Sequence, residues 1–194
     1  EPVSQATLRI VKVFWGLDAS LAYKRHFPAI NWLTSYSLYQ EKVDVWADKN
    51  VNDNFSAQRA QAMKLLQVES ELQEIVQLVG VDSLSDGDRL ILEVTRSIRE
   101  DFLHQNSFHE VDTYTSLHKQ YRMMGLILKF YKSAQDAIKQ NVTINDIIKL
   151  SVLEKIGRAK YVEEGDIDAA YDSIEDEIDN ELADLIKKRG AEEL

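Results

Sequence analysis

The chain has 194 residues, with 33 Asp or Glu against 23 Lys or Arg, so its formal net charge at pH 7 is −10. This negative charge opposes a general attraction to nucleic-acid phosphates or anionic lipid, and we expect no nucleic acid as a partner. The absence of cysteine excludes a disulfide framework, a thiol nucleophile and a cysteine zinc site. Only seven Gly and two Pro interrupt a sequence rich in helix-forming residues, which predicts a mainly α-helical protein.

Arg9 to Trp15 (RIVKVFW) is apolar on both faces and predicts a strand inside a covered sheet. No second segment of comparable β character follows, which indicates a piece of a larger α/β domain. A short helix is expected after Asp18, as far as about His26. It should give way to a turn or loop at Phe27-Pro28, because the residue before proline is pushed out of helical geometry.

Apolar residues at three- and four-residue spacing predict five further helices. Their expected ranges are residues 56–80, 86–103, 117–141, a fourth from Thr143 through Ile156, and 167–188. Leu72 and Leu128 are expected in the core of the resulting bundle. The sequence thus predicts an α/β remnant over residues 1–55 and a helical domain over residues 56–194.

Tyr161 to Ile186 holds eleven carboxylates and no basic residue, yet keeps an apolar stripe of helical period. The apolar face must pack on the rest of the chain. The acidic face is expected to be solvated, and a cation or partner site is the alternative.

No segment carries a self-contained active site. A loop that cradles phosphate needs closely spaced glycines, and the seven glycines here are isolated. His104 and His109 are five residues apart, which gives only weak support for a metal site. No apolar run approaches the roughly 18 residues that span a bilayer, and no signal segment is seen, so we expect a cytoplasmic chain without direct membrane insertion.

Three long, aromatic-rich segments resemble, in order, the region after the nucleotide-binding core of catalytic A subunits of A/V-type rotary ATPases. They are Glu1 to Tyr39, Leu78 to Tyr114 and Gln120 to Tyr131. The resemblance implies the end of a nucleotide-binding domain in residues 1–55, followed by the helical C-terminal domain of an ATP synthase or ion-translocating ATPase.

The resemblance also implies a setting. The complete subunit would bind ATP or ADP with Mg²⁺ and couple ATP chemistry to proton or sodium transport. It would lie beside B subunits in a hexameric ring at the cell membrane and contact central-shaft subunits. In this family the phosphate loop and the catalytic Glu lie upstream of the matched region. We therefore expect no catalytic residue here, no tightly bound nucleotide and no activity of this chain alone.

Site residues follow from the matched motifs. Phe27 in HFPAINW corresponds to an aromatic position that stacks on adenine, and Phe108 and Tyr114 in NSFHEVDTY match the pair that closes the adenine pocket. The alternative is that all three are core aromatics.

Asp82, Asp86 and Asp88 in VDSLSDGDR match an acidic tip that leans on the shaft. The same residues could instead belong to an ordinary helix connection rich in capping residues.

Two other functions compete with this interpretation. One is a free-standing acidic helical adaptor that binds a basic protein. The predicted apolar strand argues against it. The other is the non-catalytic B subunit of the same machine, which the motifs around Phe27 and Phe108 fit less well.

Overall fold

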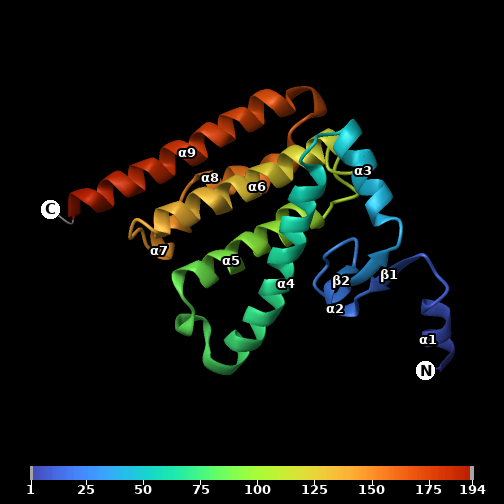
Figure 1. The fold of residues 1–194 in the computed structure, drawn as a ribbon. Coiled ribbons are helices and arrows are strands. Elements are labelled where there is room, and N and C mark those ends of the chain that lie inside the picture. The colour runs from blue at the N-terminus through green and yellow to red at the C-terminus, as the bar shows by residue number, and fades with distance from the viewer. Residues whose placement is uncertain (1, 193–194) are drawn as a thin grey trace.

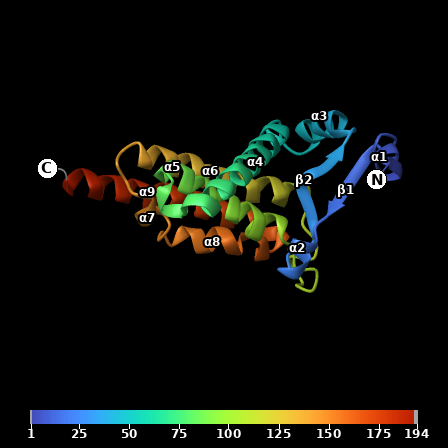
Figure 2. The same cartoon turned by 90° about the horizontal axis from the view of Figure 1, so that it is seen from below.

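The computed structural model describes residues 2–192, and the outermost residues of the two predicted domains, 1 and 193–194, lie outside it. Helices dominate this part of the chain, and a two-stranded antiparallel sheet lies near the N-terminus (Figure 1 and, turned by 90°, Figure 2). The expectation of a mainly α-helical protein is therefore confirmed. The division at residue 55 stays a prediction, although a long helix does begin there.

The N-terminal part consists of α1 (Pro2–Leu8), β1 (Val13–Leu17), α2 (Ala19–Tyr23), β2 (Ile30–Ser37) and α3 (Gln40–Asn50). The predicted short helix after Asp18 is confirmed as α2, and the Asp18 carboxylate caps it by accepting the Ser20 amide at 2.8 Å. The Phe27-Pro28 turn is also confirmed, with a cis peptide bond.

The predicted strand is displaced and has a partner, contrary to expectation. It begins at Val13 instead of Arg9 and pairs with β2 in antiparallel register, with Phe14 opposite Tyr36. The register shifts between Phe14 and Gly16. A Cβ on Gly16 would lie 2.6 Å from the Thr34 hydroxyl, so any larger residue there would force the Thr34 side chain to move. The sheet is not covered on both sides, because Trp15 and Leu17 are exposed.

The helical part contains α4 (Phe55–Val79), α5 (Asp86–Ser97), the π-helical turn η2 (Ile98–Leu103), α6 (Leu117–Ile138), α7 (Ile144–Ile147), α8 (Val152–Arg158) and α9 (Ile167–Glu192). Short 3-10 turns connect them: η1 (Val81–Ser83), η3 (Ala159–Tyr161) and η4 (Glu164–Asp166). Four of the five predicted helices are confirmed in place. Local signals explain the ends, since Gly80 ends α4 with a φ of 86° and the Ser85 hydroxyl accepts the Asp88 amide to start α5.

The fourth predicted helix is wrong as a single element, because it divides into α7 and α8. The break lies around Leu150 and Ser151. The Glu181 carboxylate of α9 accepts hydrogen bonds from the Ser151 hydroxyl and the Val152 amide, and so satisfies the new N-terminus of α8. A contact from a distant helix therefore permits a break that local periodicity does not reveal.

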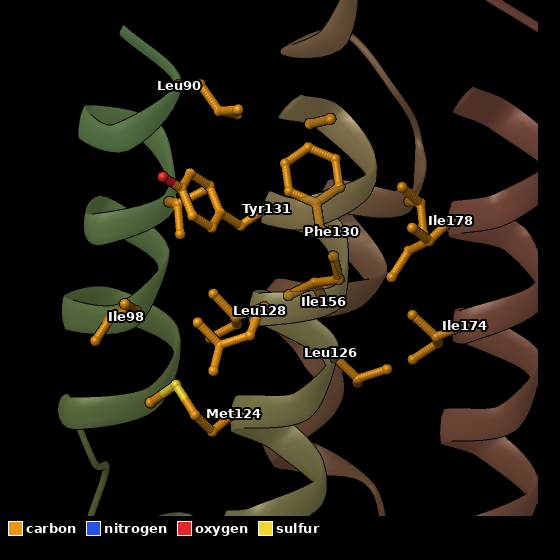
Figure 3. Close-up of a cluster of buried hydrophobic side chains, with 14 of the residues drawn as sticks. Leu90, Ile98, Met124, Leu126, Leu128, Phe130, Tyr131, Ile156, Ile174 and Ile178 are labelled. Carbon is orange, nitrogen blue, oxygen red and sulfur yellow. The ribbon is translucent and has the colours of Figure 1, made fainter. Parts of the chain in front are cut away.

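One hydrophobic core joins α4 to α9, with α6 between α5 and α9 (Figure 3). Leu90 from α5 and the pair Ile174 and Ile178 from α9 point toward α6 from opposite sides. Leu72 and Leu128 are both only 7% exposed, which confirms their expected burial, although Leu72 lies outside the main cluster.

The acidic face of α9 is exposed but also paired within the chain. Arg122 of α6 contacts Asp168 and Asp172 at 2.6 Å each and Glu175 at 3.4 Å, while Lys129 contacts Asp179 at 2.7 Å. The apolar stripe of α9 thus packs against α6, and Arg122 and Lys129 of α6 pair with acidic residues of α9 beside this contact. Solvation is only part of the explanation for the run of carboxylates.

Candidate functional site

The turn at Phe27 and the segment from His104 to Ser116, called here the aromatic loop, lie side by side. The Phe27 amide donates to His104 Nδ1 at 3.1 Å, across 77 residues of sequence, and the Gln105 amide donates to the Phe27 carbonyl at 2.8 Å. His26 is buried beneath the turn against the rings of Trp32 and His104, and this burial lowers its pKa. The fold therefore brings together two predicted site segments.

The aromatic loop has no helical or strand pattern, but side chains hold its backbone. Asp112, 3% exposed, accepts the Asn106 amide on its carboxylate at 2.7 Å and the Gln105 side chain on its carbonyl at 2.8 Å. His109 Nδ1 accepts the amides of Val111 and Asp112. These bonds replace the backbone pairing that a regular element would supply.

The aromatic rings at the predicted positions face solvent. Phe27 is 50% exposed, Phe108 is 97% exposed and Tyr114 is 72% exposed. The alternative that these are core aromatics is therefore wrong for this chain. An exposed aromatic face can stack on a planar ring of a ligand, because its surface is not used by the core.

A cavity of about 230 Å³ lies between the turn and the base of the aromatic loop. Its lining includes Pro28, Leu103, Gln105, Asp112 and Thr115. None of the three predicted rings lines it. Within residues 2–192 the chain thus offers an open aromatic surface beside a small cavity with both apolar and polar lining residues.

Two buried lysines, Lys119 and Lys160, hold the chain on either side of the aromatic loop, and neither was predicted as a site residue. Lys119 is fully buried, and its Nζ donates to the carbonyls of Lys160 at 2.9 Å and Val162 at 2.6 Å. Burial lowers the pKa of Lys119. The Nζ of Lys160 donates to the carbonyls of Glu100 and His104 at 3.0 Å each. No sequence signal distinguishes these lysines from surface ones.

The three aspartates of the predicted tip differ in their surroundings. Asp86 accepts the Ile144 amide at 3.0 Å and so caps α7, and Asp88 accepts the Ser85 hydroxyl at 2.7 Å. Asp82, in η1, is exposed. The connection of α4 to α5 projects at the lower end of the molecule in Figure 1, away from the β1–β2 hairpin. Hydrogen bonds within the chain therefore account for the presence of Asp86 and Asp88. Asp82 is exposed, so among the three its carboxylate is the most accessible to another protein.

His104 and His109 act as hydrogen-bond acceptors in the loop, as described above. Among residues 2–192, no group of three or more His, Asp or Glu side chains is placed to hold a metal ion. Nor is any helix in this part of the chain both long enough and apolar enough to cross a bilayer.

Comparisons with known proteins agree on one family. The sequence model of the C-terminal domain of V and A type ATP synthase matches residues 44–148. V-type ATP synthase alpha chains are similar over nearly the whole chain: that of Acetivibrio thermocellus is 57% identical over 188 residues, or 97% of this chain, and that of Thermoanaerobacter pseudethanolicus is 59% identical over 192 residues, or 99%. This chain covers 32% of each of these relatives, about a third of their length.

A solved structure is also similar. It is described as a unique ATP synthase subunit NeqB from Nanoarcheaum equitans, and it is 23% identical with a TM-score of 0.49. The match covers 66% of this chain and 30% of that one.

Proposed function

This chain belongs to the family of the C-terminal domain of V- and A-type ATP synthases, and we propose that it supplies the adenine-facing side of a nucleotide site in a complete alpha chain. The observation that supports this is the pair of hydrogen bonds joining Phe27 to the aromatic loop, beside exposed rings. Stacking between aromatic faces would hold the base, while the open loop leaves it accessible. The free-standing adaptor is not favoured, because similarity to alpha chains extends over nearly the whole chain.

The proposal assigns the base, and not the phosphates, to this chain. Phosphate binding needs clustered backbone amides, and the glycines here are isolated. Residues 2–192 offer no cluster of carboxylates or histidines for Mg²⁺. The complete subunit would supply those groups from elsewhere, and we assign no catalytic residue to this chain.

The wider setting belongs to the same proposal. The complete subunit would make or hydrolyse ATP in a hexameric ring with B subunits, on the cytoplasmic side of the membrane, coupled to proton or sodium transport. The tip would face the central shaft through Asp82, with Asp86 and Asp88 shaping the turn by capping. Carboxylates at a projecting turn suit contact with a basic surface.

Photolabelling with 2-azido-ATP tests the adenine assignment in the assembled complex. The azide on the adenine ring labels residues that touch the base, so label is expected in peptides that contain Phe27, Phe108 or Tyr114. Excess ATP should abolish it. Protectable label confined to peptides outside residues 1–194 would refute the assignment.

The absence of cysteine permits a matching test of the tip. Asp82→Cys introduces a thiol that is unique within these residues, and a short thiol-to-amine cross-linker should join it to a shaft subunit in the assembled enzyme. Asp176→Cys on the exposed face of α9 is the control and should not give that product. Equal cross-linking from both positions, or none from Asp82→Cys, would contradict a shaft contact.

A further inference from the structure

Lys160 occupies an unusual place for a charged side chain. It lies in η3, is 5% exposed, and its ammonium has no carboxylate partner among its hydrogen bonds. Its two hydrogen-bond acceptors are the carbonyls of Glu100 and His104, at the C-terminal end of η2. Burying an ammonium is costly unless it is well bonded, so this arrangement needs a strong local reason.

Part of the reason is electrostatic. The last carbonyls of a helix have no partner within the helix, and they carry partial negative charge. The ammonium of Lys160 satisfies two such carbonyls where η2 ends and the aromatic loop begins. The ring of Tyr161, 5.7 Å away, adds a cation–π contact. Lys160 therefore fixes the direction in which the chain leaves η2.

The same residue joins the two halves of the proposed adenine site. Lys160 holds the His104 carbonyl, the His104 ring accepts the Phe27 amide, and the neighbouring Gln105 amide donates to the Phe27 carbonyl. Beneath it, Lys119 of α6 holds the carbonyl of Lys160 itself. A continuous set of hydrogen bonds thus runs from the bundle core to the Phe27 turn.

We propose that Lys160 is a positioning residue that sets the spacing between Phe27 and the aromatic loop, and thereby the affinity of the site for the adenine ring. The effect on affinity rests on the function proposed above. Lys160 does not touch the nucleotide in this proposal. It acts through His104 and Gln105, which hold the turn.

The first test measures amide hydrogen exchange in the 194-residue chain. Lys160→Met keeps the aliphatic length and removes the donors, and it should speed exchange at the Phe27 and Gln105 amides by about tenfold. Lys160→Arg restores donors and should recover slow exchange. Lys160→Gln is a milder variant for use if Lys160→Met does not fold. Leu128→Ala is the matched control, because it weakens the core away from the loop.

The second test measures steady-state kinetics of the full-length subunit in the assembled enzyme. Lys160→Met should raise the KM for ATP about three- to tenfold while kcat changes less than about twofold, since the base is remote from the breaking bond. Leu128→Ala should leave KM unchanged, as should any change that only lowers stability. Recovery of KM in Lys160→Arg would support positioning.

The outcomes separate the two proposals. Unchanged exchange at Phe27 and Gln105 in a folded Lys160→Met or Lys160→Gln variant overturns the positioning role. Faster exchange with an unchanged KM, while Phe108→Ala does raise KM, overturns the link from Lys160 to adenine affinity. An unchanged KM in Phe108→Ala as well rejects the adenine site, and the affinity role of Lys160 with it.

Discussion

Phe108→Ala should separate a ligand contact from a folding role. The exposure of the side chain predicts almost no change in stability, whereas loss of a stacking contact predicts a large change in nucleotide affinity. The side chain is 97% exposed, so its removal uncovers almost no apolar surface. The Phe108 amide donates to Asn106 Oδ1 at 3.0 Å through the backbone, which alanine retains. The free energy of unfolding should stay within about 0.5 kcal/mol of wild type, and Tm within about 2 °C.

The functional effect should be much larger. Stacking of a base on an aromatic side chain contributes about 1–3 kcal/mol by alanine substitution, which corresponds to a roughly 5- to 150-fold change in affinity. Adenine is remote from the bond that breaks, so the loss should be the same in the ground state and the transition state. The KM for ATP should therefore rise by that factor while kcat changes little.

Steady-state ATP hydrolysis by the assembled complex provides the assay, with thermal unfolding measured on the 194-residue chain. Phe108→Tyr keeps the ring face and should behave like wild type in both. An unchanged KM in Phe108→Ala, with the complex intact, would refute adenine stacking. A large fall in Tm would instead show that the ring has a structural role that its exposure does not reveal.

Three further predictions concern the chain alone. The purified chain should show no ATPase activity, because it lacks groups that neutralise a transferring phosphate; turnover that survives removal of contaminants would contradict this. Leu128→Ala should cost about 2–5 kcal/mol and lower Tm by at least about 4 °C in a thermal scan, since the side chain is packed in the core. Because burial lowers the pKa of His26, the unfolded chain binds a proton first as the pH falls below about 6.5. Urea titrations should show the free energy of unfolding falling from that pH toward the lower folded pKa, and falling less steeply in His26→Gln.

Helices with one strong apolar face were predictable from the sequence, and weakly patterned elements were not. The stripe through Leu65 and Leu72 and the Ser85 cap are local signals. The prediction therefore placed both ends of α4 within one residue, and the predicted helix 86–103 spans α5 together with η2. β2 mixes Asn, Thr and Ser with apolar residues and is only partly covered, so no strict alternation marks it. In α3 only Ala47 is buried, which leaves no apolar stripe for detection.

The features of the candidate site that come from local sequence were also predictable, whereas those that depend on distant contacts were not. The aromatic motifs were visible because they are local strings of letters, but their exposure depends on the loop that Asp112 organises. The burial of Lys119 and Lys160 depends on helices that meet only in three dimensions. The cations that pair with α9 are also distant: Arg122 lies 46 residues before Asp168. The sequence of α9 alone therefore could not show that its carboxylates pair with cations of α6.

The arrangement of α5 links the two proposed contact sites mechanically. α5 and η2 follow each other without a gap, with 12 and 6 residues, so one helical segment of roughly 25 Å runs from Asp86 at the tip to the start of the aromatic loop. Its far end is clamped by Lys160. If both proposed contacts are made, a displacement of the tip moves the loop relative to Phe27 unless the hairpin follows. Adenine affinity and shaft contact would then be coupled, and by linkage each binding equilibrium must shift the other by the same factor.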